Sequence, residues 1–368
     1  MPALLIQTPL PDDSTCAPKD GPDGKILKVS ARSILEHYDV QELRELERLR
    51  WLGWNEPAMQ SYYDGRRHRA GQPVYEQQCY HYNAAAKDMH ELISIADFVP
   101  ESGIYDFLSL RCLQGGHSSA VLQSTPGAFG VGICLPAEHA EGTFLLDKLD
   151  KKLAKRFTRF ERDLGTDELP PFPHIPSFQL VVLEGNRLRV HLDREEKEAM
   201  LSIPDVLGSA RLVGDLIAAL AFVQAGGTIV ARLSHLEEFP SAQLLYLLDM
   251  ISGAVIVHKP SYWGSGATRP SFYAVAKGVA ATAEHALLRE RYLVGLRALW
   301  ADLGGGEGNN TSAARGLRFD DLDFVVSAND ILNPEGYLPR LVELGRDVWK
   351  TQAQAIGGFL ARRGVRGV

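Results

Sequence analysis

The stretch "FLSLRCLQGGHSS", from Phe107 to Ser119, decides the fold of this chain. It begins as an apolar strand and ends on a Gly-Gly pair before two serines, where a helix is expected to start. This is the outline of a nucleotide-binding turn, because glycines let the backbone approach a ligand and a helix N-terminus favours anionic groups. The positions where such turns usually carry an acid and extra glycines are occupied by Ser109, Arg111, Leu113 and Gln114. The stretch therefore predicts the turn and leaves its occupancy by a cofactor open.

Apolar strands and helices alternate on either side of this turn. Strands are expected in "IYDFLSL", "TPGAFGVGICLP", "FQLVVLEG" and "AGGTIVARLSHLEEF". Such alternation predicts a mostly parallel sheet buried on both faces. The last two strands, "AVIVHKP" and "SFYAVAKGV", are joined without room for a helix and predict an antiparallel hairpin at one edge. Helices are expected at about 30–54, 75–95, 204–224, 241–252, 283–303 and 334–363.

The composition narrows the class of protein. The chain has 368 residues, of which 45% are hydrophobic and 23% charged, and a formal net charge of −7. A generally basic nucleic-acid-binding surface is therefore not expected. No apolar run is long enough to span a membrane, and the first 25 residues read as a flexible leader rather than a secretory signal. Four scattered cysteines without a CxxC pair read as reduced thiols, so an intracellular location, cytoplasmic or nuclear, is expected.

One segment carries a local concentration of positive charge. Residues 147–163, "DKLDKKLAKRFTRFERD", read as a charged helix whose basic residues share a face. A solvated helix face is one interpretation, and a phosphate-facing patch for RNA is the other. The basic positions are Lys148, Lys152, Lys155, Arg156 and Arg159.

Four blocks in order resemble one family. "FLSLRCLQGGHSS", "GVGICLP", "LVVLEGNRLR" and the segment from "GGTIVARL" to "YAVAKGV" resemble FtsJ-like (RrmJ-type) ribose 2′-O-methyltransferases of fungal type. The resemblance covers about residues 78–279 and implies a Rossmann-like class I methyltransferase fold with N- and C-terminal helical extensions. It divides the chain into a leader (1–25), a helical extension (26–98), the methyltransferase-like domain (99–280) and a C-terminal helical extension (281–368). It also implies S-adenosylmethionine as cofactor and an RNA ribose 2′-hydroxyl as methyl acceptor.

The resemblance implies a cofactor site around the glycine turn. Gly115 and Gly116 stand at its glycines, with Cys112 and His117 beside them. The family's acid on the first strand is replaced by Ser109, and Arg111 adds a cation near a cationic ligand. The acid that follows the second strand in the family is also missing. Cys134 stands near that position, and Glu138 is the nearest carboxylate.

A Lys-Asp-Lys-Glu set is the family's catalytic pattern, and this chain departs from it. Glu184 matches the Asp position and Arg232 the second Lys position, and Arg232 cannot act as a general base because a guanidinium does not deprotonate. The final Glu falls on Ser271 or Phe272. Lys87 is the only lysine on the 78–91 segment, where the first lysine is expected. An ion pair between Glu184 and Arg232 is predicted, either at the mouth of the site or as a structural salt bridge.

The sequence is compatible with three functions. The first is an S-adenosylmethionine-dependent methyltransferase acting on RNA or another hydroxyl. The second is a catalytically inactive methyltransferase-like binding or scaffold protein, favoured by the joint loss of the acids and the second lysine. The third is an enzyme of this fold that acts on a small molecule. No metal-ligand spacing is present in the sequence, and His235 is a weaker candidate for a base.

Overall fold

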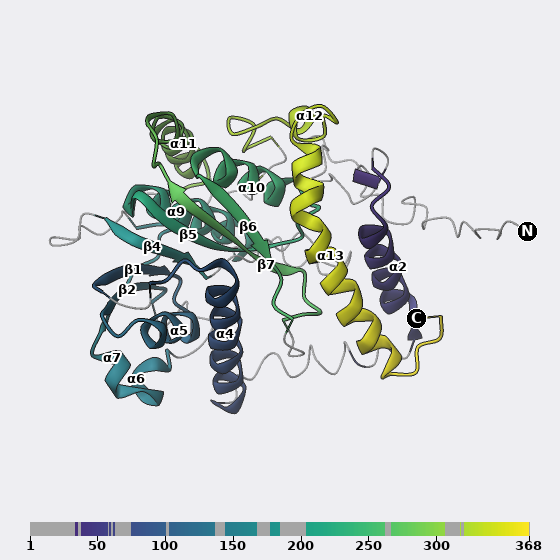
Figure 1. The fold of residues 1–368 in the computed structure, drawn as a ribbon, viewed down its shortest axis with the longest axis horizontal. Helices are drawn as coiled ribbons and strands as arrows, with labels where there is room; N and C mark the ends of the chain where they lie inside the picture. The colour runs from purple at the N-terminus through teal and green to yellow at the C-terminus, as the bar shows by residue number, and fades with distance from the viewer. Residues whose placement is uncertain are drawn as a thin grey trace, which may run out of the picture.

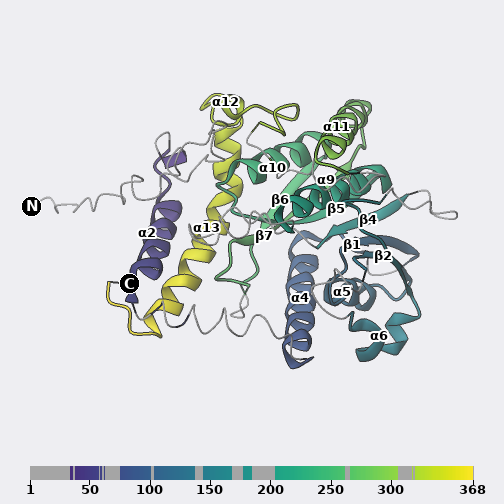
Figure 2. The same cartoon turned by 180° about the vertical axis from the view of Figure 1, so that it is seen from behind.

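The computed structural model describes residues 34–35, 38–57, 59, 62, 75–100, 103–136, 144–167, 177–184, 204–261, 266–305, 317 and 320–367. Within these ranges the chain forms one seven-stranded sheet with helices on both faces (Figures 1 and 2). The strands are β1 (Tyr105–Leu110), β2 (Ala128–Cys134), β3 (Phe157–Glu161), β4 (Phe178–Leu183), β5 (Val223–Ser234), β6 (Ala254–His258) and β7 (Ser271–Val279).

The strand order is β3-β2-β1-β4-β5-β7-β6. Strands β1 to β5 are parallel to one another, and β7 runs antiparallel to both β5 and β6. This is the Rossmann-like class I methyltransferase fold, so the predicted fold class is confirmed. The antiparallel hairpin lies at one edge of the sheet, as predicted, and β6 is the outermost strand.

The helices largely follow the apolar patterns of the sequence. They are α2 (Gln41–Asn55), α4 (Tyr75–Ala96), α5 (Gly116–Ser124), α6 (Leu146–Leu149), α7 (Lys151–Ala154), α9 (Pro204–Phe222), α10 (Phe239–Ile251), α11 (Ala283–Asp302), α12 (Ala328–Ile331) and α13 (Leu338–Ala361). The helix predicted at about 30–54 is interrupted at residues 38–40: Ile34 and Leu35 are helical, α2 begins at Gln41, and residues 30–33 lie outside the described residues. The predicted leader, residues 1–25, lies outside the described residues.

Alternate residues of β1 face two hydrophobic clusters, one on each side of the sheet. Tyr105 and Phe107 pack with residues of α4, α5 and α7, whereas Leu108 and Leu110 pack with residues of α9 and α10. The second cluster continues through α2, α11 and α13. Helices α2 and α13 lie side by side next to the hairpin in both views (Figures 1 and 2). The helical extensions therefore share a core with the sheet, and their exact boundaries stay predictions.

The predicted charged helix at 147–163 is wrong. Asp150 ends α6 and caps α7, where its carboxylate accepts hydrogen bonds from two backbone N–H groups. Residues 157–161 then pair with β2 as the edge strand β3. The guanidinium of Arg156 donates to the carbonyl oxygens of Leu122, Thr125, Pro126 and Ala128 and so closes the end of α5. The five basic residues do not share one helix face, so the predicted RNA-facing helix does not form.

Candidate functional site

The glycine turn joins β1 to α5 as predicted. Gly115 is the N-terminal cap of α5 with a left-handed φ of 86°, and no side chain caps the helix there. A Cβ on Gly115 would lie 2.7 Å from the Phe144 ring, and one on Gly116 would clash with the carbonyl oxygen of Tyr82 on α4. Gly115 thus supplies a backbone conformation that favours glycine, and Gly116 permits α4 to pack closely on α5.

A buried hydrogen-bonded chain lies beside this turn. The Ser109 hydroxyl donates to Glu184 Oε1 over 2.5 Å, and His117 Nδ1 lies 2.9 Å from Glu184 Oε2. His117 Nε2 lies 2.7 Å from the hydroxyl of Tyr273 on β7. Burial raises the pKa of Tyr273, so its hydroxyl stays protonated and donates. A neutral His117 with its hydrogen on Nδ1 satisfies every bond of this chain.

The hydrogen bonds of Ser109, Glu184, His117 and Tyr273 correct two predictions from the sequence. No hydrogen bond or ion pair joins Glu184 to Arg232 in the part of the chain that the structure describes, and Glu184 binds Ser109 and His117 instead. Ser109 has no carboxylate of its own, but its hydroxyl contacts that of Glu184, which directly follows β4, because β1 and β4 pair in parallel. A carboxylate is therefore present between the end of β1 and the first turn of α5.

The prediction that Arg111 adds a positive charge near the ligand is wrong. Its Nε lies 2.6 Å from Asp215 Oδ2 on α9, on the other face of the sheet. Burial raises the pKa of Asp215 to about 6, while the positive charge of Arg111 opposes that rise. The positive charge that Arg111 adds at this position is thus balanced by Asp215, a partner that the sequence alone could not identify.

The cysteines also differ from the prediction. Cys112 and Cys134 form a disulfide that joins the carboxyl ends of β1 and β2, so the reading of these two residues as reduced thiols is wrong. Cys79 is a free thiol, and Cys16 lies outside the described residues. Cys134 therefore offers no group to a ribose hydroxyl. Glu138, the other candidate for that role, lies outside the described residues.

Lys87 is on the predicted helix, but its side chain is exposed. The neighbouring residue, Asp88, faces the candidate site instead. Burial raises the pKa of Asp88, and the charges of Arg232 and Lys259 act in the opposite direction. Successive residues of a helix point about 100° apart, which is why one position separates an exposed lysine from a carboxylate at the site.

Arg232 lies near the carboxyl end of β5, opposite Tyr273 of β7. Its guanidinium makes neither a hydrogen bond nor an ion pair within the described residues, and its charge acts on Asp88, Lys259 and Tyr273. Neither Ser271 nor Phe272 provides the missing carboxylate, and Phe272 is fully buried. His235 lies 3.3 Å from Glu237 Oε1 in a separate cluster that includes Arg50.

Lys259 is a buried residue whose importance the sequence did not reveal. Its ammonium donates to the carbonyl oxygens of Arg269 (2.6 Å) and Ser271 (2.8 Å), and it lies 3.4 Å from that of Gly266. Burial lowers its pKa to about 7, with further contributions from the charges of Arg50 and Arg232. These contacts hold the loop between β6 and β7 against the candidate site. Tyr262 and Trp263 of that loop lie outside the described residues.

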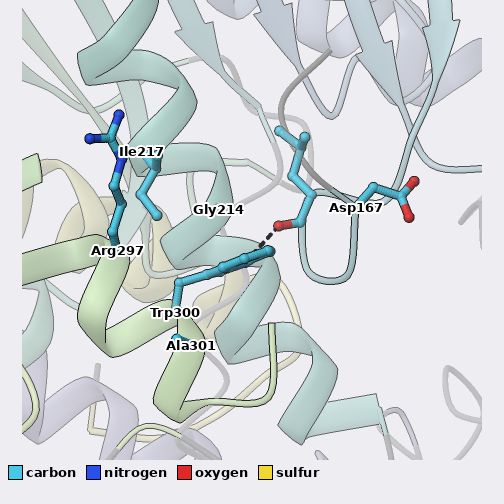
Figure 3. Close-up of a pocket in the computed structure, with 7 residues that line it drawn as sticks. Asp167, Gly214, Ile217, Arg297, Trp300 and Ala301 are labelled. Carbon is cyan, nitrogen blue, oxygen red and sulfur yellow. Dashed lines mark hydrogen bonds between the residues drawn. The ribbon is translucent and has the colours of Figure 1, made fainter. Parts of the chain in front are cut away.

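A cavity of about 440 Å³ lies outside this cluster, between α9, α11 and the turn after β3 (Figure 3). Trp300 forms one wall, and its indole N–H donates to the carbonyl oxygen of Leu164 over 2.9 Å. None of its lining residues belongs to the hydrogen-bonded chain at the glycine turn.

Among the described residues, no group of His, Cys, Asp or Glu is arranged to hold a metal ion. In those same ranges, no helix has the length and apolarity to cross a membrane.

Several solved structures that are similar to this chain are structures of methyltransferases. No protein-family model matches the sequence, and no curated protein matches it. A putative ribosomal RNA methyltransferase from Plasmodium falciparum is similar at 16% identity and a TM-score of 0.37, covering 54% of this chain and 98% of that one. Phosphoethanolamine N-methyltransferase 1 from Haemonchus contortus, solved with phosphoethanolamine and S-adenosylhomocysteine, is similar at 12% identity and a TM-score of 0.37, covering 66% of this chain and 55% of that one. An rRNA methylase from Streptococcus thermophilus is similar at 10% identity and a TM-score of 0.31, covering 52% of this chain and 93% of that one.

Similarities at these sequence identities and TM-scores do not indicate an activity for this chain. The methyltransferase fold follows from the strand order and directions themselves. Membership of the FtsJ-like family stays a prediction from the sequence blocks.

Proposed function

We propose that this chain is an S-adenosylmethionine-dependent methyltransferase that acts on a hydroxyl group, by sequence resemblance a ribose 2′-hydroxyl of RNA. The observation that carries the proposal is the Glu184 carboxylate, held by Ser109 and His117 beside the Gly115-Gly116 turn. A negative charge there, together with a helix N-terminus, provides the two groups needed to bind an amino acid's ammonium and carboxylate.

The residues present fit the amino-acid end of S-adenosylmethionine. The backbone of Gly115 and Gly116 and the first turn of α5 would hold its carboxylate, and Glu184 its ammonium. The hydroxyl of Ser118, in that first turn, is buried and has no hydrogen-bond partner among the described residues. When bound, the cofactor supplies an electrophilic methyl group. The chain's own contribution is to hold the cofactor and to position and deprotonate the acceptor.

A second candidate function is a methyltransferase-like binding protein that has lost the cofactor. Three observations favour it. The Phe144 ring lies 2.7 Å from the position that a Cβ of Gly115 would take, so protein atoms already cover part of the turn. The side chains of the Ser109–Glu184–His117–Tyr273 chain satisfy one another without a ligand. The disulfide at Cys134 also removes a possible partner for the cofactor's ribose.

Calorimetric titration of the purified chain with S-adenosylmethionine and S-adenosylhomocysteine separates the two functions. The methyltransferase proposal expects binding, and ligand at about 100 times its dissociation constant should add roughly 2.7 kcal/mol to the free energy of unfolding. Glu184→Gln should weaken binding at least tenfold, whereas Glu76→Gln on an exposed turn of α4 should not. No heat and no thermal shift with either ligand would leave the binding-protein function.

A further inference from the structure

The ionisable side chains near the glycine turn fall into two groups, those engaged with protein partners and those without one. His117 uses both ring nitrogens, toward Glu184 and Tyr273. Both oxygens of Glu184 accept hydrogen bonds. The Lys259 ammonium is directed at backbone carbonyls. In the described residues, only Asp88 and Arg232 of this cluster lack a hydrogen bond or ion pair.

Asp88 is held in place by contacts on both sides of α4. Gly116 lets α4 pack against α5 at Tyr82 and Ala85, which lie within two turns before Asp88. One turn after it, Glu91 Oε1 lies 2.9 Å from His258 Nε2 and accepts from the backbone N–H of Ser261 over 3.2 Å. Glu91 is therefore engaged at the end of β6 and does not compete for the same space. These contacts fix the helix while leaving the Asp88 carboxylate without a partner.

The ionisable groups around Asp88 come from four elements. His117 lies on α5, Arg232 on β5, Lys259 just after β6, and Glu91 on α4 itself. An ionised carboxylate that is half-buried, near cations but not bonded to them, is costly unless a ligand completes its environment. The same holds for Arg232, whose guanidinium can donate five hydrogen bonds. Two unengaged groups of opposite charge at the carboxyl edge of a doubly wound sheet mark the place where a substrate is expected.

We propose that Asp88 accepts the proton of the acceptor hydroxyl and that Arg232 binds an anionic group beside that hydroxyl. This inference rests on the proposed methyltransferase function. The acceptor oxygen gives its proton to the Asp88 carboxylate as it forms the bond to the methyl carbon. The sulfur–methyl bond breaks, and its electron pair stays on sulfur, which becomes a neutral thioether. Charge balances, because one carboxylate and one sulfonium are both neutralised. No other candidate fits as well: His117 and Glu184 are engaged, Lys259 is bonded to the loop, and Arg232 does not deprotonate.

The acceptor class follows from this pair of groups. Arg232 suits a phosphate or carboxylate, and Asp88 suits a hydroxyl a short distance away. A phosphate with a neighbouring sugar hydroxyl satisfies both, either within an RNA strand or in a free nucleotide. Two probes distinguish these sources: a mixed-sequence RNA 20-mer and adenosine 5′-monophosphate.

The test measures methyl transfer from labelled S-adenosylmethionine to each probe in the full chain. Asp88→Asn should lower kcat at least 100-fold and leave the dissociation constant of S-adenosylmethionine unchanged, whereas Glu76→Gln should alter neither. Arg232→Met should raise KM for the responding probe at least tenfold, and Arg232→Lys should restore part of that loss. The acid limb of the wild-type pH–rate profile should be absent from Asp88→Asn.

A second measurement does not depend on turnover. The free energy of unfolding is compared between wild type and Asp88→Asn from about pH 3 to about pH 8. Because burial raises the pKa of Asp88 in the folded chain, the stability that its protonated form contributes is lost as pH rises from its ordinary pKa of 3.8 through the raised pKa, so Asp88→Asn should gain stability relative to wild type over that interval. An equal pH dependence of both proteins would overturn the placement of Asp88. Transfer at the wild-type rate by Asp88→Asn would overturn its role while leaving the methyltransferase proposal intact. A wild-type chain that binds no S-adenosylmethionine would overturn both.

Discussion

At the scale of single residues, the Tyr273 hydroxyl is the outer end of the buried chain that fixes His117 and Glu184. Tyr273→Phe leaves His117 Nε2 buried without a donor. The expected cost is about 1–3 kcal/mol in the free energy of unfolding, measured by urea titration. Tyr246→Phe is a matched control, because the Tyr246 hydroxyl makes no hydrogen bond in the described ranges. Equal losses in the two variants would mean that the chain does not stabilise the fold.

The disulfide is a second residue-scale feature with a direct test. It closes a segment of 22 residues across the glycine turn, and the loop-entropy model gives about 3 kcal/mol of stabilisation for a segment of that length. A dithiol reductant should therefore lower the melting temperature of the wild type and have no effect on Cys134→Ser. Cys79→Ser, which changes the free thiol, should respond to reductant as the wild type does. A wild type insensitive to reductant would contradict the bond.

The sequence did not predict the contacts of the candidate site residues. Ser109, Gly115, Gly116 and His117 lie at the glycine turn, but Glu184, which was predicted to pair with Arg232, binds Ser109 and His117 there instead. Their partners depend on strand register and side-chain direction, which spacing does not reveal. From the sequence alone, Ser109 indicates the loss of an acid. The pairing of β1 with β4 shows that the Glu184 carboxylate lies next to it.

At the scale of elements, the packing of α4 against α5 positions the site. Gly116→Ala places a Cβ against the Tyr82 carbonyl, which is backbone and cannot rotate away. Forcing the helices apart should cost about 1–3 kcal/mol, read as a lower urea midpoint at constant slope. Gly253→Ala is the control, because its Cβ would meet only the Lys277 carbonyl at 3.6 Å. A Gly116→Ala variant as stable as Gly253→Ala would show that the close approach is unimportant.

Element prediction from the sequence failed where local signals competed. Residues 147–163 carry helical spacing of basic residues, yet Asp150 interrupts the helix as a cap and β3 forms by pairing with β2. Edge pairing is a tertiary interaction and overrides local propensity. The long apolar strands and helices were predicted correctly, because burial on both faces leaves a strong pattern. On α4 the helix was predicted, but the residue facing the site was Asp88 rather than Lys87.

At the scale of the whole molecule, α2 and α13, from opposite ends of the chain, are joined to the sheet by one buried cluster. Arg50 on α2 lies 2.6 Å from Glu237 Oε1 and donates to Gln352 on α13 over 3.2 Å. The Trp349 indole donates to the other oxygen of Glu237 over 3.1 Å. Glu237 belongs to the turn between β5 and α10, two residues after His235. The helices of the two extensions therefore hold the turn that follows the strand bearing Arg232.

Arg50→Met tests whether these parts form one cooperative unit. Removing Arg50 leaves Glu237 buried without its main cation, and the expected loss at pH 7 is about 3–5 kcal/mol. Arg44→Met is the control on the same helix: Arg44 pairs with Asp39 in the open, where both side chains are more than half exposed, and the expected loss is below about 1 kcal/mol. Both variants should unfold in one transition, and two separate transitions in either would contradict the shared core.

The effect of pH gives this last prediction its sign. Arg50 and His235 hold the pKa of Glu237 well below its ordinary value of 4.5 despite burial. In the wild type, the stability contributed by this carboxylate is therefore present above about pH 4.5 and is lost as pH falls through the lowered pKa. In Arg50→Met the main cause of lowering is gone, so Glu237 takes up its proton at a higher pH and no longer carries a buried charge in acid. The stability difference between wild type and Arg50→Met, measured by urea unfolding, should be largest near pH 7 and shrink toward pH 4. A difference that stays constant over that range would mean that Arg50 contributes packing rather than charge.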